Sequence, residues 1–169
     1  GQRPGDVYPT YEQVKEDLTI VQRHWRYIRL YSCDQHAQTV LEVIRNEQLP
    51  IQVMLGAYLE GEQSNPNCPW GGEYSDEEID SHKKKNKAEI ETLIAWANAN
   101  EDIIIALAVG NESCVDWSGN MVPVDHMIAY IRQVKASTNQ AVTFCENYVP
   151  WLDKLEPLVE ELDFISIHT

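Results

Sequence analysis

The chain has 169 residues, of which 43% are hydrophobic and 24% are charged, a composition typical of a single globular domain with a buried core. Its net charge of -14, from 27 acidic and 13 basic side chains, repels phosphate backbones and anionic lipid surfaces. This argues against nucleic-acid partners and favours a neutral substrate. No apolar stretch approaches the length of a transmembrane helix, so no membrane span is expected.

Helix and strand patterns alternate along the chain. Residues 10–13 have the form of a capping box, and Val14, Leu18, Val21 and Trp25 follow at the spacing of an amphipathic helix. Further helices are predicted over about 39–48, 75–100, 124–138 and 151–162, and strands over 25–31, 51–58, 103–109, 142–145 and 164–167. Because right-handed crossovers connect strands that are each preceded by a helix, this order predicts an α/β fold with a parallel sheet.

The residues at the strand ends favour a barrel over an open nucleotide-binding sheet. An open sheet of that kind has a glycine-rich turn after an early strand, and neither G-x-G-x-x-G nor G-x-x-x-x-G-K-[ST] occurs in the chain. Polar side chains instead follow all five predicted strands: Asp34, Glu60, Asn111 with Glu112, Glu146 with Asn147, and His168. This distribution is typical of the active face of a (β/α)8 TIM barrel, which is the predicted fold.

The predicted barrel is incomplete. An eight-stranded barrel needs roughly 250 residues, and the five predicted strands supply part of one. We therefore expect a single partial (β/α)8 catalytic domain over 1–169 and a longer natural protein. Residues 1–5 have the character of a loop that follows a missing first strand. The two unpaired parallel edges of such a domain would need a partner segment.

The leading catalytic candidate stands at the end of the strand predicted over 103–109. This run of apolar and β-branched residues fits a strand that is buried on both faces, and it stops at Gly110-Asn111-Glu112. In a barrel enzyme, an amide and a carboxylate at the carboxyl end of a strand lie on the catalytic face. Glu112 is therefore a catalytic candidate, and the alternative is that it only begins the next loop.

The four cysteines show no spacing typical of zinc ligands. Cys33 and Cys145 follow or lie in apolar strands and are expected to be small buried hydrophobes. Cys68 and Cys114 lie in two successive loops, and a disulfide bridge between them would suit an exported enzyme. We expect a secreted or periplasmic location, with a membrane-anchored parent protein as the alternative.

Six segments carry a family resemblance. They are Arg3-Pro4-Gly5 with Tyr8-Pro9-Thr10, Ile28-Arg29-Leu30-Tyr31, Val53 to Leu59, Val109-Gly110-Asn111-Glu112, Val142 to Glu146, and Asp163 to His168. In this order they resemble glycoside hydrolase family 17, in particular its bacterial and fungal branch active on β-1,3-glucan. The resemblance covers essentially the whole chain and implies strands 2 to 6 of the barrel. The loop over 62–74 and the insertion over 114–122 depart from the family pattern, so the number of sugar subsites stays open.

The resemblance also implies a mechanism. Family 17 is similar to other retaining barrel glycosidases, which use two glutamates in a double displacement. Glu112 matches the general acid/base after the fourth strand, and the nucleophile after the seventh strand would lie beyond Thr169. The implied substrate is a neutral β-1,3-glucan of the laminarin type, and no cofactor or metal is implied. We expect the 169-residue chain to be inactive alone and the full-length enzyme to be a monomer.

The implied sugar-binding residues lie at strand ends and in loops. Asn111 would bind the sugar 2-hydroxyl, and Tyr31 would lie near the cleavage point, with a core aromatic as its alternative role. Glu146 would line the cleft and orient sugars or tune Glu112, with an interior ion pair as its alternative. The further candidates, for which buried hydrogen bonding or packing is the alternative, are Asp34, Glu60, His168, Trp70, Trp117 and Trp151.

Three other functions stay open at this point. A β-1,3-glucanosyltransferase of the same family would use the same double displacement with a glucan hydroxyl in place of water. A catalytically silent carbohydrate-binding fragment would fit the missing seventh strand. A barrel metal enzyme would use Glu112, Glu146 and His168 as ligands of a hard divalent cation.

Overall fold

The computed structural model describes residues 7–169 and contains one parallel sheet. The strand order in the sheet is β1-β2-β3-β4-β5, which is also the order along the chain. The strands are β1 (Tyr27–Leu30), β2 (Gln52–Ala57), β3 (Ile104–Asn111), β4 (Ala141–Asn147) and β5 (Ser166–His168). The prediction of five parallel strands is confirmed. The segment 1–5, used for the family resemblance and as the loop after a missing strand, lies outside the described residues.

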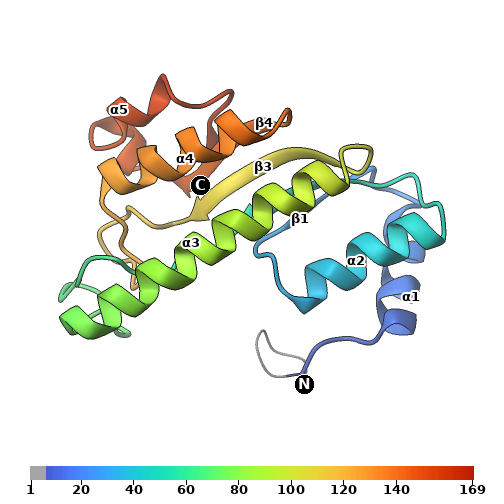
Figure 1. The fold of residues 1–169 in the computed structure, drawn as a ribbon, viewed down its shortest axis with the longest axis horizontal. Helices are drawn as coiled ribbons and strands as arrows, with labels where there is room; N and C mark the ends of the chain where they lie inside the picture. The colour runs from blue at the N-terminus through green and yellow to red at the C-terminus, as the bar shows by residue number, and fades with distance from the viewer. Residues whose placement is uncertain (1–6) are drawn as a thin grey trace.

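Helices connect the strands and cover one face of the sheet. They are α1 (Tyr11–Val21), α2 (Gln35–Asn46), α3 (Asp76–Ala99), α4 (Val124–Ser137), the 3-10 turn η1 (Pro150–Leu152) and α5 (Glu156–Val159). Figure 1 shows α2, α3 and α4 lying across the same side of the strands. A doubly wound sheet has helices on both faces and a reversal in its strand order, so this arrangement is that of a curled half-barrel. Within residues 7–169, no helix is long and apolar enough to cross a membrane.

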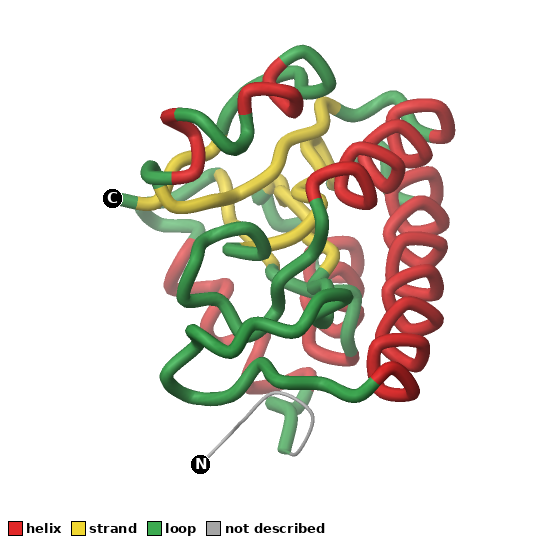
Figure 2. Tube along the Cα trace, turned by 90° about the vertical axis from the view of Figure 1, so that its left-hand side faces the viewer, coloured by secondary structure: helices red, strands yellow, loops and turns green. Residues whose placement is uncertain are grey.

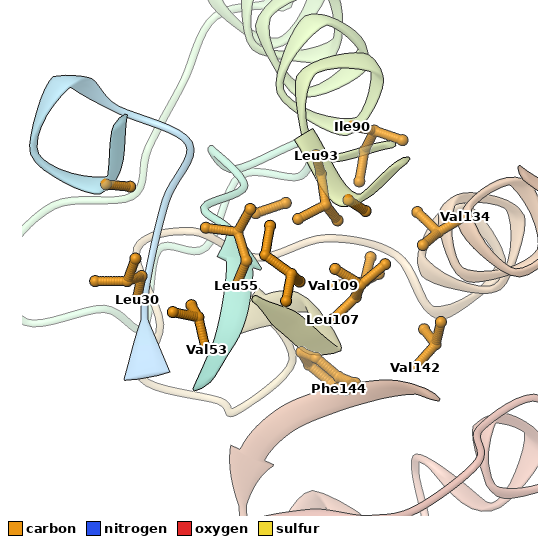
Figure 3. Packing of buried hydrophobic residues seen from close by; sticks show 14 of the residues in the cluster. Leu30, Val53, Leu55, Ile90, Leu93, Leu107, Val109, Val134, Val142 and Phe144 are labelled. Carbon is orange, nitrogen blue, oxygen red and sulfur yellow. The ribbon is translucent and has the colours of Figure 1, made fainter. Parts of the chain in front are cut away.

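The core lies between the sheet and the helices. Figure 3 shows Leu55 and Leu107 pointing from the sheet toward Ile90 of α3, and all three side chains are fully buried. Because successive strand residues point to opposite faces, Arg29 points away from the helices while its neighbour Leu30 points into the core. Arg29 therefore lies on the concave face of the half-barrel.

Two predicted helix boundaries at the amino-terminal end of the chain were wrong. α1 ends at Val21, so Trp25 does not lie on its buried face and is instead 65% exposed. α2 begins at Gln35 rather than near Thr39, because the Asp34 carboxylate accepts a hydrogen bond from the backbone N–H of Ala37 at 2.9 Å. That contact is an N-cap, which starts a helix at the following residue.

The prediction that 151–162 is mostly helical was also wrong. The segment contains only part of η1 and the four-residue helix α5. Proline has no N–H and its ring clashes with the carbonyl four residues earlier, so a helix that runs through Pro157 is disfavoured. Pro157 instead lies in the first turn of α5, where the missing N–H has no cost.

Two long loops at the carboxyl ends of β2 and β3 are joined to each other. The loops cover residues 58–75 and 112–123. The buried side chain of Asn65 donates from Nδ2 to the backbone oxygens of Asp116 and Ser118, at 2.7 and 2.9 Å. Figure 2 views the molecule from the side toward which β3 points in Figure 1. In this view long loops lie in front of the strands. The loops therefore form one wall beside the strand ends.

All four cysteines are free. The structure therefore contains no disulfide bridge between Cys68 and Cys114. The Sγ of Cys114 lies 3.5 Å from the backbone oxygen of Val122, and burial raises the pKa of this thiol to about 12. Cys145 is buried in β4, as predicted for a small hydrophobe, while Cys33 is only partly buried.

Candidate active site

The end of β3 presents Glu112 through an unusual backbone conformation. The pairing of β3 with β4 is irregular between Ala108 and Asn111. Gly110 has a φ of 86°, and Glu112 has a φ of 49°, in the left-handed region that non-glycine residues seldom occupy. Strained backbone of this kind clusters at functional sites. The backbone geometry therefore indicates a functional site at the end of β3, where the sequence also predicted one.

The carboxylate of Glu112 is partly exposed and contacts His168 of the last strand. The Glu112 side chain is 42% exposed and the His168 side chain 29%. Oε1 of Glu112 lies 2.9 Å from Nδ1 of His168. The carboxyl ends of parallel strands lie at one edge of a sheet, and here that edge brings together two residues that are far apart in the sequence.

Arg29 in the middle of β1 connects several of the predicted site residues. Its Nη2 donates to Oδ1 of Asn111 at 2.6 Å, and its Nη1 lies 2.9 Å from Nε2 of His168. Its guanidinium carbon is 4.3 Å from the centroid of the Tyr31 ring, which is a cation–π contact. Tyr31, Asn111, His168 and Glu112 therefore form one network around Arg29.

Glu146 occupies a buried position next to this network. Its side chain has no exposed surface. Its two carboxylate oxygens accept hydrogen bonds from the backbone N–H groups of Cys114 and Asn147, each at 2.7 Å. Burial is the main cause that raises the pKa of Glu146, and the nearby charge of Glu112 acts in the same direction. Glu146 thus supports the loop after β3, and its carboxylate has no surface to offer a sugar hydroxyl.

A groove of about 540 Å³ opens beside Arg29 at the ends of β1 and β2. This volume lies within the range of roughly 300–1,000 Å³ found for small-molecule sites. Tyr31 and Tyr58 line it and are 55% and 44% exposed, so aromatic surface is available to a ligand. Asp34 and His36 also line the groove. The structure therefore places Tyr31 and Asp34 at an open concave surface.

Glu60 and Trp151, two further predicted sugar-binding residues, also lie outside the Arg29 network. Glu60 forms an ion pair with Lys85 of α3, with both carboxylate oxygens 3.0 Å from Nζ, and a further contact of 3.2 Å with His82. Trp151 packs against Phe144 with ring centroids 6.0 Å apart. Sugar contact by either residue stays a prediction.

The comparisons with known proteins give structural neighbours only, since no protein-family model and no curated protein sequence matches the chain. An endo-laminarinase from Formosa Hel1_33_131 superposes with a TM-score of 0.76 at 24% identity, over 95% of this chain and 45% of the enzyme. An active-site mutant of the Rhizomucor miehei β-1,3-glucanosyltransferase, in complex with laminaritriose, gives a TM-score of 0.66 at 21% identity over 95% and 52%. A β-glucuronidase from Parabacteroides merdae gives 0.60 at 17% identity over 95% and 18%.

The likeness to these structures supports a partial α/β barrel fold for this chain. At these identities the neighbours show the fold and not the substrate, because one barrel fold supports many chemistries. The chain spans about half the length of the first two neighbours. The partial α/β barrel predicted from the sequence is thereby supported, while membership of glycoside hydrolase family 17 is not shown.

The site residues do not assemble into a metal centre. Within residues 7–169, no group of three or more His, Cys, Asp or Glu side chains is arranged to hold a metal ion. Glu146 directs its oxygens at backbone N–H groups rather than toward Glu112 and His168. The alternative in which these three residues bind a divalent cation therefore has no ligand set.

No functional role was predicted for Arg29, although it lies in one of the segments that carry the family resemblance. A signal was available, because a cation in the middle of a short apolar strand needs a partner.

Glu89 of α3 was also missed: it accepts hydrogen bonds from the backbone N–H groups of Cys33 at 2.8 Å and Tyr58 at 3.2 Å. Burial raises the pKa of Glu89. This carboxylate fixes the ends of β1 and β2 beside the groove.

A second missed cluster surrounds Glu62, whose side chain is only 1% exposed. Its Oε1 accepts from Nδ2 of Asn86 at 2.8 Å and from the hydroxyl of Tyr130 at 2.6 Å, and its Oε2 lies 2.7 Å from Nδ1 of His126. Burial and the Glu62 hydrogen bond raise the pKa of Tyr130. The cluster ties the start of the 58–75 loop to α3 and α4, and its members are too far apart in sequence for any local pattern to reveal it.

Proposed function

We propose that this chain carries the acid/base part of the active site of a retaining glycoside hydrolase that acts on β-1,3-glucan, with Glu112 as the general acid/base. The single observation that carries the proposal is the presentation of Glu112. Its carboxylate is partly exposed at the carboxyl end of β3, on a left-handed backbone, and is bound by His168. The substrate class comes from the first two structural neighbours, which are named for laminarin and β-1,3-glucan.

Under this proposal the chain supplies strands 2 to 6 of an eight-stranded barrel, and the nucleophile glutamate comes from a segment outside this sequence. Glu146 does not fit that role, because it is fully buried and holds backbone N–H groups. A family 17 assignment, a secreted or periplasmic location and a monomeric full-length enzyme belong to the same proposal.

The reaction would proceed in two displacements. Glu112 protonates the departing glycosidic oxygen while the nucleophile, roughly 5–5.5 Å away, attacks the anomeric carbon. Glu112 then removes a proton from the incoming acceptor. Arg29 holds Oδ1 of Asn111, which leaves the amide N–H groups of Asn111 to donate to the sugar 2-hydroxyl. Tyr31 would stack against a sugar ring in the groove.

Hydrolysis and glucanosyl transfer differ only in the acceptor, which is water or a glucan hydroxyl. The neighbours include one enzyme named for each activity. Incubation of the protein that carries this chain with a short laminari-oligosaccharide separates the two. Products longer than the substrate demonstrate transfer, and shorter products alone demonstrate hydrolysis.

The test of the central claim is Glu112→Gln in the protein that carries this chain. Loss of a general acid lowers the rate by about 10²–10⁴-fold, and we expect that loss on laminari-oligosaccharides. Aryl β-glucosides with good leaving groups need little protonation, so their first step should be much less impaired. The matched control is Glu16→Gln on the exposed face of α1, which should leave both rates unchanged. An equal loss on both substrates would refute the acid/base role.

One observation favours a second candidate for the 169 residues by themselves. Glu146 is buried and Asp34 caps α2, so neither offers Glu112 an exposed partner carboxylate. A chain in this state would bind glucan without cleaving it. Measured turnover of laminari-oligosaccharides by the 169-residue chain would contradict both this candidate and the proposal that the nucleophile lies elsewhere.

A further inference from the structure

We propose that Arg29 fixes His168 as the tautomer with its proton on Nδ1, and that His168 in this form is a positioning residue for Glu112. In this arrangement His168 holds Oε1 of Glu112 and leaves Oε2 to carry the catalytic proton. The catalytic part of this inference rests on the proposed function. The tautomer itself rests on the geometry alone.

The first step concerns the contact between Arg29 and His168. A guanidinium group has five N–H donors and no acceptor. Nη1 of Arg29 lies 2.9 Å from Nε2 of His168, so the imidazole nitrogen at this contact must offer its lone pair. A hydrogen on Nε2 would place two N–H groups head to head. Both the doubly protonated ring and the tautomer with its hydrogen on Nε2 are therefore incompatible with this contact.

The second step follows for the other ring nitrogen. A neutral imidazole carries one hydrogen, and with Nε2 acting as acceptor that hydrogen is on Nδ1. Nδ1 lies 2.9 Å from Oε1 of Glu112, so His168 donates to the carboxylate. The hydrogen bonds thus run in one direction, from Arg29 through His168 to Glu112.

The third step assigns the two oxygens of Glu112. Oε1 accepts from His168, so in the acid form the hydrogen is on Oε2. In the first displacement the Oε2–H bond breaks, the hydrogen passes to the glycosidic oxygen, and its electron pair remains on Oε2 as the carboxylate forms. In the second displacement Oε2 takes a hydrogen from water or from a glucan hydroxyl. His168 keeps its Nδ1 hydrogen throughout, since Arg29 occupies the nitrogen that a proton relay would need.

The surroundings agree with a positioning role. Arg29 is itself held in place, because its other terminal nitrogen donates to Asn111 and its guanidinium lies over the ring of Tyr31. The oxygens of the neighbouring Glu146 accept from the backbone N–H groups of Cys114 and Asn147 and take no part in holding Glu112. The orientation of the Glu112 carboxylate is therefore set from the two edges of the half-barrel.

The tautomer is tested by ¹⁵N NMR of the histidine side chains in the full chain at neutral pH, with the His168 signals assigned by their absence from His168→Asn. We expect the Nδ1 shift of a protonated nitrogen and the Nε2 shift of a nitrogen with a lone pair. A protonated Nε2, alone or together with a protonated Nδ1, would overturn the assignment. This measurement requires no glucan activity, so it stands even if the proposed function fails.

The positioning role is tested with paired variants in the protein that carries this chain. In His168→Asn the side-chain amide nitrogen occupies about the position of Nδ1 of the histidine ring. In His168→Gln it occupies about the position of Nε2. We expect His168→Ala and His168→Gln to lower kcat on laminari-oligosaccharides by on the order of 10²-fold with little change in KM, as for misplacement of a catalytic group. His168→Asn should recover most of the lost rate, and the control His24→Asn, at an exposed turn, should have no effect. Equal losses in Asn and Gln, or better recovery by Gln, would overturn the role.

Discussion

Arg29 in β1 and His168 in β5 are in contact, with Nη1 and Nε2 2.9 Å apart, although their strands form opposite edges of the sheet. Neighbouring strands are spaced by about 4.8 Å, so the edges of a flat five-stranded sheet would be roughly 19 Å apart. No arginine side chain spans that distance. The contact therefore requires a strongly curled sheet, and it places the residues of the candidate active site inside the curve.

The Arg29 contacts give the first prediction. Arg29→Lys keeps the positive charge but has no planar fork with which to hold Asn111 and His168 together. A hydrogen bond to a charged group contributes about 1.5–3 kcal/mol, so kcat on laminari-oligosaccharides should fall by at least about tenfold. Steady-state kinetics would measure this, with thermal melts to confirm the fold. Full activity in Arg29→Lys would show that the fork is dispensable.

The buried carboxylate of Glu146 gives a prediction about pH. Burial raises its pKa above the ordinary value of 4.5, so the folded state binds the Glu146 proton more tightly than the unfolded state does. That contribution is fully present below pH 4.5 and is lost as the pH rises through the raised pKa. We therefore compare the free energy of unfolding of the unsubstituted protein with that of Glu146→Gln. The first value minus the second should decrease from acid to neutral pH. Urea titrations across that range measure the difference, and a difference that grows with pH would contradict the assignment.

The Glu62 cluster gives a prediction about stability. Tyr130→Phe removes the hydroxyl that donates to Glu62 at 2.6 Å and leaves a buried carboxylate with one fewer partner. The expected loss in the free energy of unfolding is about 1.5–3 kcal/mol. Tyr148→Phe is the matched control, because Tyr148 is 52% exposed, and its change should stay within about 0.5 kcal/mol. Equal small effects in both variants would show that the cluster contributes little.

Gly110 gives a prediction about the backbone that presents Glu112. At a φ of 86° an alanine is strained, and its Cβ would lie 3.1 Å from Met127 Cε and 3.2 Å from Phe144 Cε2. Gly110→Ala should cost at least about 1–2 kcal/mol, the cost of a left-handed residue with a Cβ. Gly119→Ala, where the added Cβ meets its nearest atom at 3.6 Å, should be close to neutral. Chemical denaturation measures both, and a neutral Gly110→Ala would remove the claim that this turn requires glycine.

Tyr31 gives a prediction about substrate binding. Its exposed ring lines the groove, and we expect Tyr31→Ala to raise KM for laminari-oligosaccharides by about 2- to 13-fold, as for the loss of roughly 0.5–1.5 kcal/mol of aromatic contact. Tyr27→Ala is the control, since Tyr27 begins β1, does not line the groove and is 66% exposed. A KM that rises equally in both variants would assign the effect to the strand rather than to the groove.

Two of the boundaries that were predicted wrongly, the start of α2 and the extent of α5, share one cause. Side-chain caps and prolines act on single residues, and they decided where α2 begins and how short α5 is, through Asp34 and Pro157. Apolar periodicity averages over a whole turn and does not detect them. The apolar pattern did predict the five strands, and the alternation of helices and strands predicted their parallel arrangement.

The candidate site was found from the sequence only in part. Asn111, Glu112 and His168 were predicted because each stands at the end of a strand, and Tyr31 was predicted from the family resemblance alone. The structure joins the four in one network. Arg29, which holds that network, stands in mid-strand and was not assigned. Glu146 also follows the strand-end rule, and yet the structure buries it.

The amino-acid sequence by itself determined the alternation of helices and strands and the strand ends at which polar side chains stand, because hydrophobic periodicity and strand punctuation are local properties. Only the tertiary structure decided which of those side chains meet. The curl of the sheet brings Arg29 to His168 and His168 to Glu112. The loop after β3 packs over Glu146 and buries its carboxylate. Such contacts depend on distances between segments far apart in the chain, and no local pattern encodes those distances.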